Sequence, residues 1–96
     1  MGDSSGGGLA LNVALETINK GLPKPFALAL LAPWVDLEFH GDSMLTLKDF
    51  DINPPTVEWF YQSVEGFIGD FQRTDPLVSP LQNDLSDLCP TYIQQG

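Results

Sequence analysis

Basic residues are scarce in this 96-residue sequence. Four Lys and Arg stand against thirteen Asp and Glu, and the formal net charge is −9. A surface of that sign repels nucleic-acid phosphates and anionic lipid, so we expect no nucleic-acid partner. Long apolar runs are also lacking, because the longest, 26–33, falls far short of the roughly 20 residues that span a bilayer. We therefore expect no membrane span.

Cysteine and histidine each occur once. Cys89 cannot form an intramolecular disulfide, and we interpret it as a small buried thiol. A single cysteine suits a reducing compartment, and no basic region followed by an apolar run opens the chain, so the predicted localisation is cytoplasmic. Metal ligands at short spacing are not evident, with one His and one Cys and dispersed acidic residues. No metal and no cofactor are predicted.

The pattern of apolar residues predicts an α/β chain. The stretch Gly6–Lys20 has apolar residues around most of a helical circumference, which indicates a largely buried helix ending at a glycine. Phe26–Ala32 reads as a strand buried on both faces, and Thr91–Gln95 as a second strand. Between them we predict a helix over Pro55–Ile68 and a short helical turn within Asp84–Leu88. Two strands joined through a helix indicate a parallel crossover.

A glycine–serine pattern opens the chain. Gly2-Asp3-Ser4-Ser5-Gly6 satisfies G-x-S-x-G, the pattern of a sharp strand-to-helix turn that exposes a nucleophilic serine. The backbone at such a serine is strained, and its neighbours must be small for strand and helix to approach. Two other readings remain. One is a flexible leader, and the other is a phosphate-binding loop, which would lack its usual Lys-Ser/Thr ending.

Four segments, in order, resemble one protein family. GDSSGGGLA at Gly2–Ala10 resembles the GDSAGG elbow of the hormone-sensitive-lipase-like branch of the α/β-hydrolases. LLAPWVDL at 30–37, TDPLVSPL at 74–81 and DLCPTYIQQG at 87–96 resemble further motifs of that family. Two positions depart mildly from it, since Cys89 stands where proline is usual and Ser5 where alanine is commonest.

The resemblance implies a fold and an activity. Residues 1–96 would form a single partial α/β-hydrolase domain, from the nucleophile elbow to the strand that precedes the catalytic acid. Ser4 would be the nucleophile of carboxylic-ester hydrolysis, the Ser5 backbone amide would be an oxyanion donor, and Asp3 would shape the turn. The acid and histidine of the triad would lie beyond Gly96. The strand feeding the elbow would likewise precede these residues. We therefore expect this chain, alone, to hydrolyse esters negligibly.

Other chemistry-bearing residues have plainer interpretations. We read His40 as a solvent-facing loop residue, and Asp36 and Asp75 as carboxylates that cap loops. Four aromatic residues are assigned to the core or to the lining of an acyl pocket: Trp34, Trp59, Phe60 and Tyr61.

Two functional hypotheses follow. The first is a fragment of a serine esterase that acts on a small ester in the parent family. The second is a non-catalytic interaction or oligomerisation module, whose unpaired strand edges are covered in a homo-oligomer or by a complementing chain.

Overall fold

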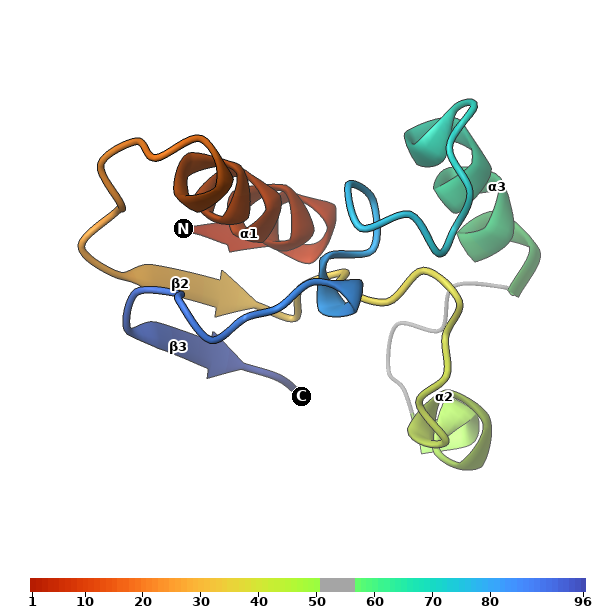
Figure 1. The fold of residues 1–96 in the computed structure, drawn as a ribbon. Helices are drawn as coiled ribbons and strands as arrows, with labels where there is room; N and C mark the ends of the chain where they lie inside the picture. Colours follow the sequence, from red (N-terminus) through yellow and green to blue (C-terminus); the bar gives the residue numbers. More distant parts are fainter. Residues whose placement is uncertain (51–56) are drawn as a thin grey trace.

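The strands of the protein form one parallel sheet of order β1-β2-β3 (Figure 1). The computed structural model describes residues 1–50 and 57–96. The strands are β1 (Gly2–Asp3), β2 (Leu28–Leu31) and β3 (Thr91–Gln94), and the longer helices are α1 (Ser4–Asn19) and α3 (Val57–Ile68). The parallel α/β crossover predicted from the sequence is therefore confirmed.

Helix α1 covers one face of β1 and β2 (Figure 1). Leu11, Ala14 and Leu15 of the helix are buried together with Leu28 and Leu30 of β2. Side chains alternate across a strand, so only every second residue of β2 reaches this core. The intervening residues Ala29 and Leu31 are half-buried, and no helix of the described residues covers them. The expected burial of this strand on both faces is wrong for that reason.

The strand that feeds the elbow is present in part, which corrects the expectation that it is missing. Gly2 and Asp3 pair with Leu30 and Leu31 of β2, so β2 lies between two neighbours. This strand is two residues long, and the chain passes directly from Asp3 into α1. The last strand, β3, is exposed along its whole length, since it packs against β2 on one side only.

Helix α1 is also less buried than its apolar composition predicts. Leu9 and Val13 are each more than half exposed, because the helix contacts the sheet along a single face. The helix begins at Ser4, two residues before the predicted Gly6, and ends one residue before Lys20. Cys89 is half-buried and packs against the core beneath the helix, so the expected buried thiol is only partly enclosed.

A second, smaller core lies beyond the carboxyl ends of the strands. Leu37, Val64, Ile68 and Val78 are buried there, and Trp34 and Phe60 pack against them with ring centroids 4.9 Å apart. Two of the aromatic residues assigned to a core or pocket lining are instead exposed. Trp59 is 56% and Tyr61 is 43% exposed. Tyr61 still contacts the Phe39 ring, with centroids 6.0 Å apart, but neither residue belongs to the buried core.

The remaining elements are short. They are α2 (Ser43–Thr46), a 3-10 helix η1 (Lys48–Phe50) and a 3-10 helix η2 (Pro80–Gln82). The helical turn predicted within Asp84–Leu88 is a single hydrogen-bonded turn, in which the Leu88 amide donates to the Leu85 carbonyl. The predicted start of α3 at Pro55 lies outside the described residues. Within the described residues, no helix has the length and hydropathy that crossing a bilayer requires.

Candidate functional site

Ser4 lies at the junction of β1 and α1 in a left-handed backbone conformation. Its φ is +50°, a value that L-residues adopt at a cost of about 1–2 kcal/mol. Strain of this kind persists only where the surrounding structure enforces it, and it concentrates at functional sites. Here the enforcement comes from the close approach of strand, helix and the loop after β2.

Gly2 makes the turn sterically feasible. A Cβ built on Gly2 would lie 2.2 Å from the carbonyl oxygen of Gly6, so any side chain there would push strand and helix apart. The second glycine of the motif, Gly6, meets nothing within 4 Å among the described residues. The expectation that both flanking positions must be small is therefore supported by packing at Gly2 and not at Gly6.

The loop after β2 holds the elbow from the other side. The Trp34 amide donates a 3.0 Å hydrogen bond to the Ser4 carbonyl. A Cβ on Gly7 would lie 2.8 Å from the Pro33 Cβ, and one on Gly8 would lie 2.1 Å from the Trp34 carbonyl oxygen. These glycines let the first turns of α1 rest directly on Pro33 and Trp34. The glycine run is therefore a packing surface and not a flexible leader.

The position of Ser4 gives it a positive electrostatic environment. The first amides of α1 have no intrahelical partner and carry the positive end of the helix dipole. Ser5 follows in the first turn and is exposed. Within residues 1–50 and 57–96, the Ser4 hydroxyl makes no hydrogen bond to a side chain that could accept its proton.

The single histidine belongs to a different cluster. His40 Nδ1 lies 3.0 Å from Asp36 Oδ2, and Nε2 lies 3.5 Å from Glu38 Oε2. The His40 side chain is 65% exposed, as expected for a loop histidine. Its two ring nitrogens thus face carboxylates, and neither faces Ser4. The imidazole is not placed as the base of this serine.

Asp36 shapes the loop that carries His40. Its carboxylate accepts the backbone N–H groups of Glu38 at 3.0 Å and His40 at 2.9 Å. Partial burial by itself would raise the pKa of Asp36, but these two amides and the imidazole outweigh it and hold the pKa below its usual 3.8. The prediction that Asp36 caps a loop is confirmed.

Asp75 has the same role in a second loop. Its Oδ1 accepts the Leu77 amide at 2.9 Å, as predicted for a loop-capping carboxylate. Ser79, four residues further on, was not predicted from the sequence; it is fully buried, and its hydroxyl accepts the Leu37 amide at 2.9 Å. No local pattern could reveal that bond, since it joins residues 42 positions apart.

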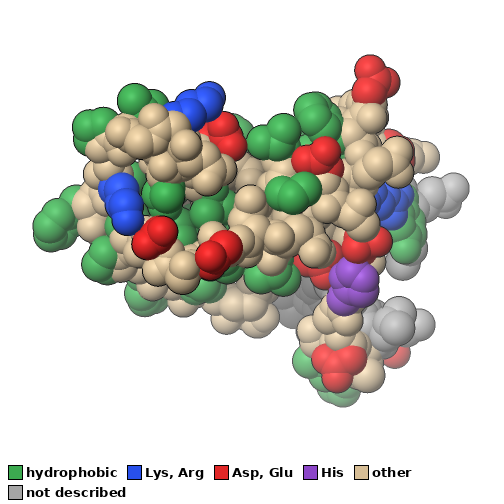
Figure 2. Space-filling view, viewed as in Figure 1, with side chains coloured by type: hydrophobic (Ala, Val, Ile, Leu, Met, Phe, Trp, Pro, Cys, Tyr) green, Lys and Arg blue, Asp and Glu red, His purple; other side chains and the backbone are tan. Residues whose placement is uncertain are grey.

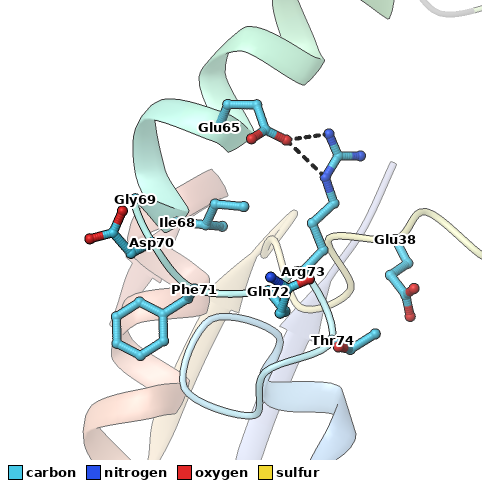
Figure 3. A pocket seen from close by; sticks show the side chains of 9 residues that line it. All are labelled: Glu38, Glu65, Ile68, Gly69, Asp70, Phe71, Gln72, Arg73 and Thr74. Carbon is cyan, nitrogen blue, oxygen red and sulfur yellow. Dashed lines mark hydrogen bonds and ion pairs between the residues drawn. The ribbon is translucent and has the colours of Figure 1, made fainter.

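A surface pocket of about 440 Å³ lies beside α3, away from the elbow (Figure 3). Arg73 extends to Glu65, with 2.6 Å between Nη2 and Oε1, and its guanidinium lies 4.8 Å from the Tyr61 ring centre. Glu38 stands at the opposite side of this pocket, apart from that ion pair. No residue of the elbow lines it, so it is not a substrate pocket for Ser4.

Comparison with known proteins identifies what this arrangement resembles. A family description of the alpha/beta hydrolase fold matches residues 1–96. An acetyl-hydrolase of Streptomyces hygroscopicus is 35% identical over 95 residues, covering 99% of this chain and 31% of its own length. A triacylglycerol lipase of Mycobacterium tuberculosis is 33% identical over 96 residues, covering all of this chain and 17% of its own length.

Solved structures show the same fold. A hormone-sensitive lipase from a metagenome library superimposes with a TM-score of 0.86 at 38% identity, over 96% of this chain and 31% of its own. An esterase/lipase from an uncultured bacterium gives 0.85 at 30% identity, over 96% of this chain and 30% of its own. The chain thus spans less than a third of the length of these relatives.

Proposed function

Because this chain belongs to the hormone-sensitive-lipase-like branch of the α/β-hydrolase fold family, we propose that it is the nucleophile-bearing segment of a serine carboxylic-ester hydrolase. The observation that carries the proposal is the strained turn at Ser4, with φ +50° between a parallel strand and a helix N-terminus. A serine held this way projects its hydroxyl away from both elements.

Ser4 and Ser5 have distinct roles in this proposal. The Ser4 oxygen attacks the ester carbonyl as a base removes its proton, and a tetrahedral intermediate forms whose oxyanion accepts the Ser5 N–H. The intermediate expels the alcohol, which takes up the proton, and leaves an acyl-enzyme. Water then attacks, the acid is released, and the Ser4 hydroxyl is restored. That the substrate is an ester is inferred from the relatives' names, an acetyl-hydrolase and a triacylglycerol lipase.

The base is not provided by the only histidine of these 96 residues, because His40 is paired with Asp36 and Glu38. Loss of triad members leaves only about 10³–10⁴-fold acceleration over water, and that remainder needs an intact oxyanion hole. We infer that the chain alone hydrolyses esters negligibly, and that the base and its orienting acid come from polypeptide outside residues 1–96.

Labelling with a fluorophosphonate, read by intact mass, tests this proposal. We expect little labelling of the chain alone and faster, one-site labelling when imidazole is added as a soluble base. The added labelling must disappear in Ser4→Ala and persist in Ser5→Ala, which removes the adjacent hydroxyl of the same motif. Labelling that is equal in the native chain and Ser4→Ala would refute the role of Ser4. Rapid labelling without imidazole would refute the absence of a base.

A second candidate function is assembly with a complementing polypeptide. One face of the parallel sheet has no helix over it in the described residues, and Tyr92 of β3, which pairs with Ala29 on that face, is 60% exposed. A pocket of about 550 Å³ also lies between α1 and the segment 23–28, with Leu9 and Val13 in its lining. Parallel sheets are normally covered on both faces. The relatives are about three times as long, so they contain additional residues that could cover the exposed face of the sheet.

Sedimentation analysis distinguishes the occupants of these surfaces. If a complementing polypeptide is required, the chain alone sediments as a monomer that binds an apolar dye, and dye binding falls when the rest of a related esterase is added. A stable homodimer that excludes the dye would show instead that a second copy covers the sheet.

A further inference from the structure

The loop 36–40 places three potential metal ligands together, and none belongs to the elbow. Ligand atoms of Asp36, Glu38 and His40 all lie within 4.8 Å of one another. Figure 2 shows the histidine at the surface with acidic side chains beside it. No metal site is predicted from the sequence, because it has one His and one Cys and its acidic residues are dispersed along the chain. The structure shows the alternative, one imidazole with carboxylates on either side.

The two ring nitrogens of His40 have different surroundings. Nδ1 is within hydrogen-bond distance of Asp36 Oδ2, at 3.0 Å. When the neutral imidazole donates its proton there, Nε2 keeps a bare lone pair. Glu38 Oε2 lies 3.5 Å from Nε2, so two electron-rich atoms are then close together. A proton or a metal cation between them removes the repulsion.

The separation of those two atoms suits a metal ion. Tetrahedral Zn²⁺ binds imidazole nitrogen and carboxylate oxygen at about 2.0–2.2 Å, which places neighbouring ligand atoms about 3.3–3.5 Å apart. The observed distance between Nε2 and Oε2 is 3.5 Å. Metal-bound histidines, moreover, usually donate their other ring N–H to a carboxylate, which fixes the tautomer and the ring plane. Asp36 occupies that position.

The surrounding charge also favours a cation. Glu38 forms no ion pair with Arg73 in the described part of the chain, because Arg73 is bound to Glu65 (Figure 3). The chain as a whole carries a formal charge of −9. An imidazole ligand selects Zn²⁺ over Mg²⁺, which prefers all-oxygen sites.

We propose that His40 Nε2 and Glu38 Oε2 form a two-ligand surface site for Zn²⁺, with Asp36 as the outer partner that orients the imidazole. Water fills the remaining coordination positions. The site is independent of Ser4 and of the proposed esterase function. It ties together the loop between β2 and α2.

Titration with ZnCl₂, followed by proton NMR, tests the site. The chain has one histidine, so its two carbon-bound ring protons give one resolvable pair of signals. We expect these signals to shift and saturate at submillimolar Zn²⁺, and to stay unchanged with MgCl₂ at the same concentration. Unmoved signals with Zn²⁺, or equal shifts with both metals, would overturn the proposal.

Variants separate ligation from simple charge. We expect Glu38→Gln and Asp36→Asn each to weaken Zn²⁺ binding by about 10–100-fold. The matched control is Asp70→Asn, which removes one negative charge from the same pocket wall but no proposed ligand. The affinity of Asp70→Asn for Zn²⁺ should remain within twofold of that of the native chain. If Glu38→Gln binds as tightly as Asp70→Asn, the pair is not a metal site. Far-UV circular dichroism checks that each variant is folded.

Discussion

The contact between α1 and Trp34 predicts opposite effects for two glycine substitutions in one helix. Gly8→Ala places a methyl group 2.1 Å from the Trp34 carbonyl oxygen, whereas Gly6→Ala meets nothing within 4 Å among the described residues. Both residues lie in the first turns of α1, so helix propensity affects them alike. The pair therefore isolates the cost of the close approach.

The magnitude for Gly8→Ala follows from three contributions. Overpacking that must move backbone costs about 1–3 kcal/mol. Moving the helix also weakens the hydrogen bond from the Trp34 amide to the Ser4 carbonyl, which contributes about 0.5–1.5 kcal/mol. Alanine returns about 0.8–1 kcal/mol through its better helix propensity. We expect a net loss of about 0.5–4 kcal/mol in the free energy of unfolding.

Gly6→Ala keeps only the favourable contribution. It should raise the free energy of unfolding by about 0.5–1 kcal/mol, because glycine in a helix costs that much relative to alanine. Urea denaturation followed by circular dichroism measures both variants, and Tm shifts of about 4–8 °C per kcal/mol provide a second readout. If the two substitutions change stability by the same amount and in the same direction, α1 does not rest on Trp34 as described.

Two further predictions concern polar contacts. Asp36 has a lowered pKa in the fold, so its ionised form stabilises the chain above the usual value of 3.8, and this stabilisation is lost as the pH falls through the lower folded pKa. Urea denaturation from pH 7 to pH 3 compares the free energies of unfolding of the native chain and Asp36→Asn. Their difference should be constant above about pH 5 and should shrink below about pH 4. A difference that stays the same over the whole pH range would contradict this. Ser79→Ala should cost about 1–3 kcal/mol, because it leaves the Leu37 amide without its partner in a buried position. Ser63→Ala, whose hydroxyl bonds within the exposed side of α3, should change stability by less than about 0.5 kcal/mol.

The sequence alone determined the features that short, contiguous stretches encode. The motif around Ser4, the apolar periodicity of α1 and α3 and the strand-forming residues of β2 and β3 each predicted an element that the structure contains. These signals are local because a helix or a strand repeats at a fixed period, and because glycine and proline act on their own backbone. The parallel arrangement followed from the helical connection between two strands.

Tertiary structure decided which predicted surfaces are covered and which residues meet. Strand β1 has two residues and exists only because β2 lies beside it, so no periodicity could reveal it. The apolar residues of α1 and β3 showed where burial was feasible, but exposure depended on whether another element packs there. The bond between Ser79 and Leu37 likewise requires the chain to fold back on itself. The imidazole of His40 lies beside two carboxylates because the backbone amides of Glu38 and His40 donate to Asp36 and bend the loop. The amino-acid sequence alone does not specify that bend.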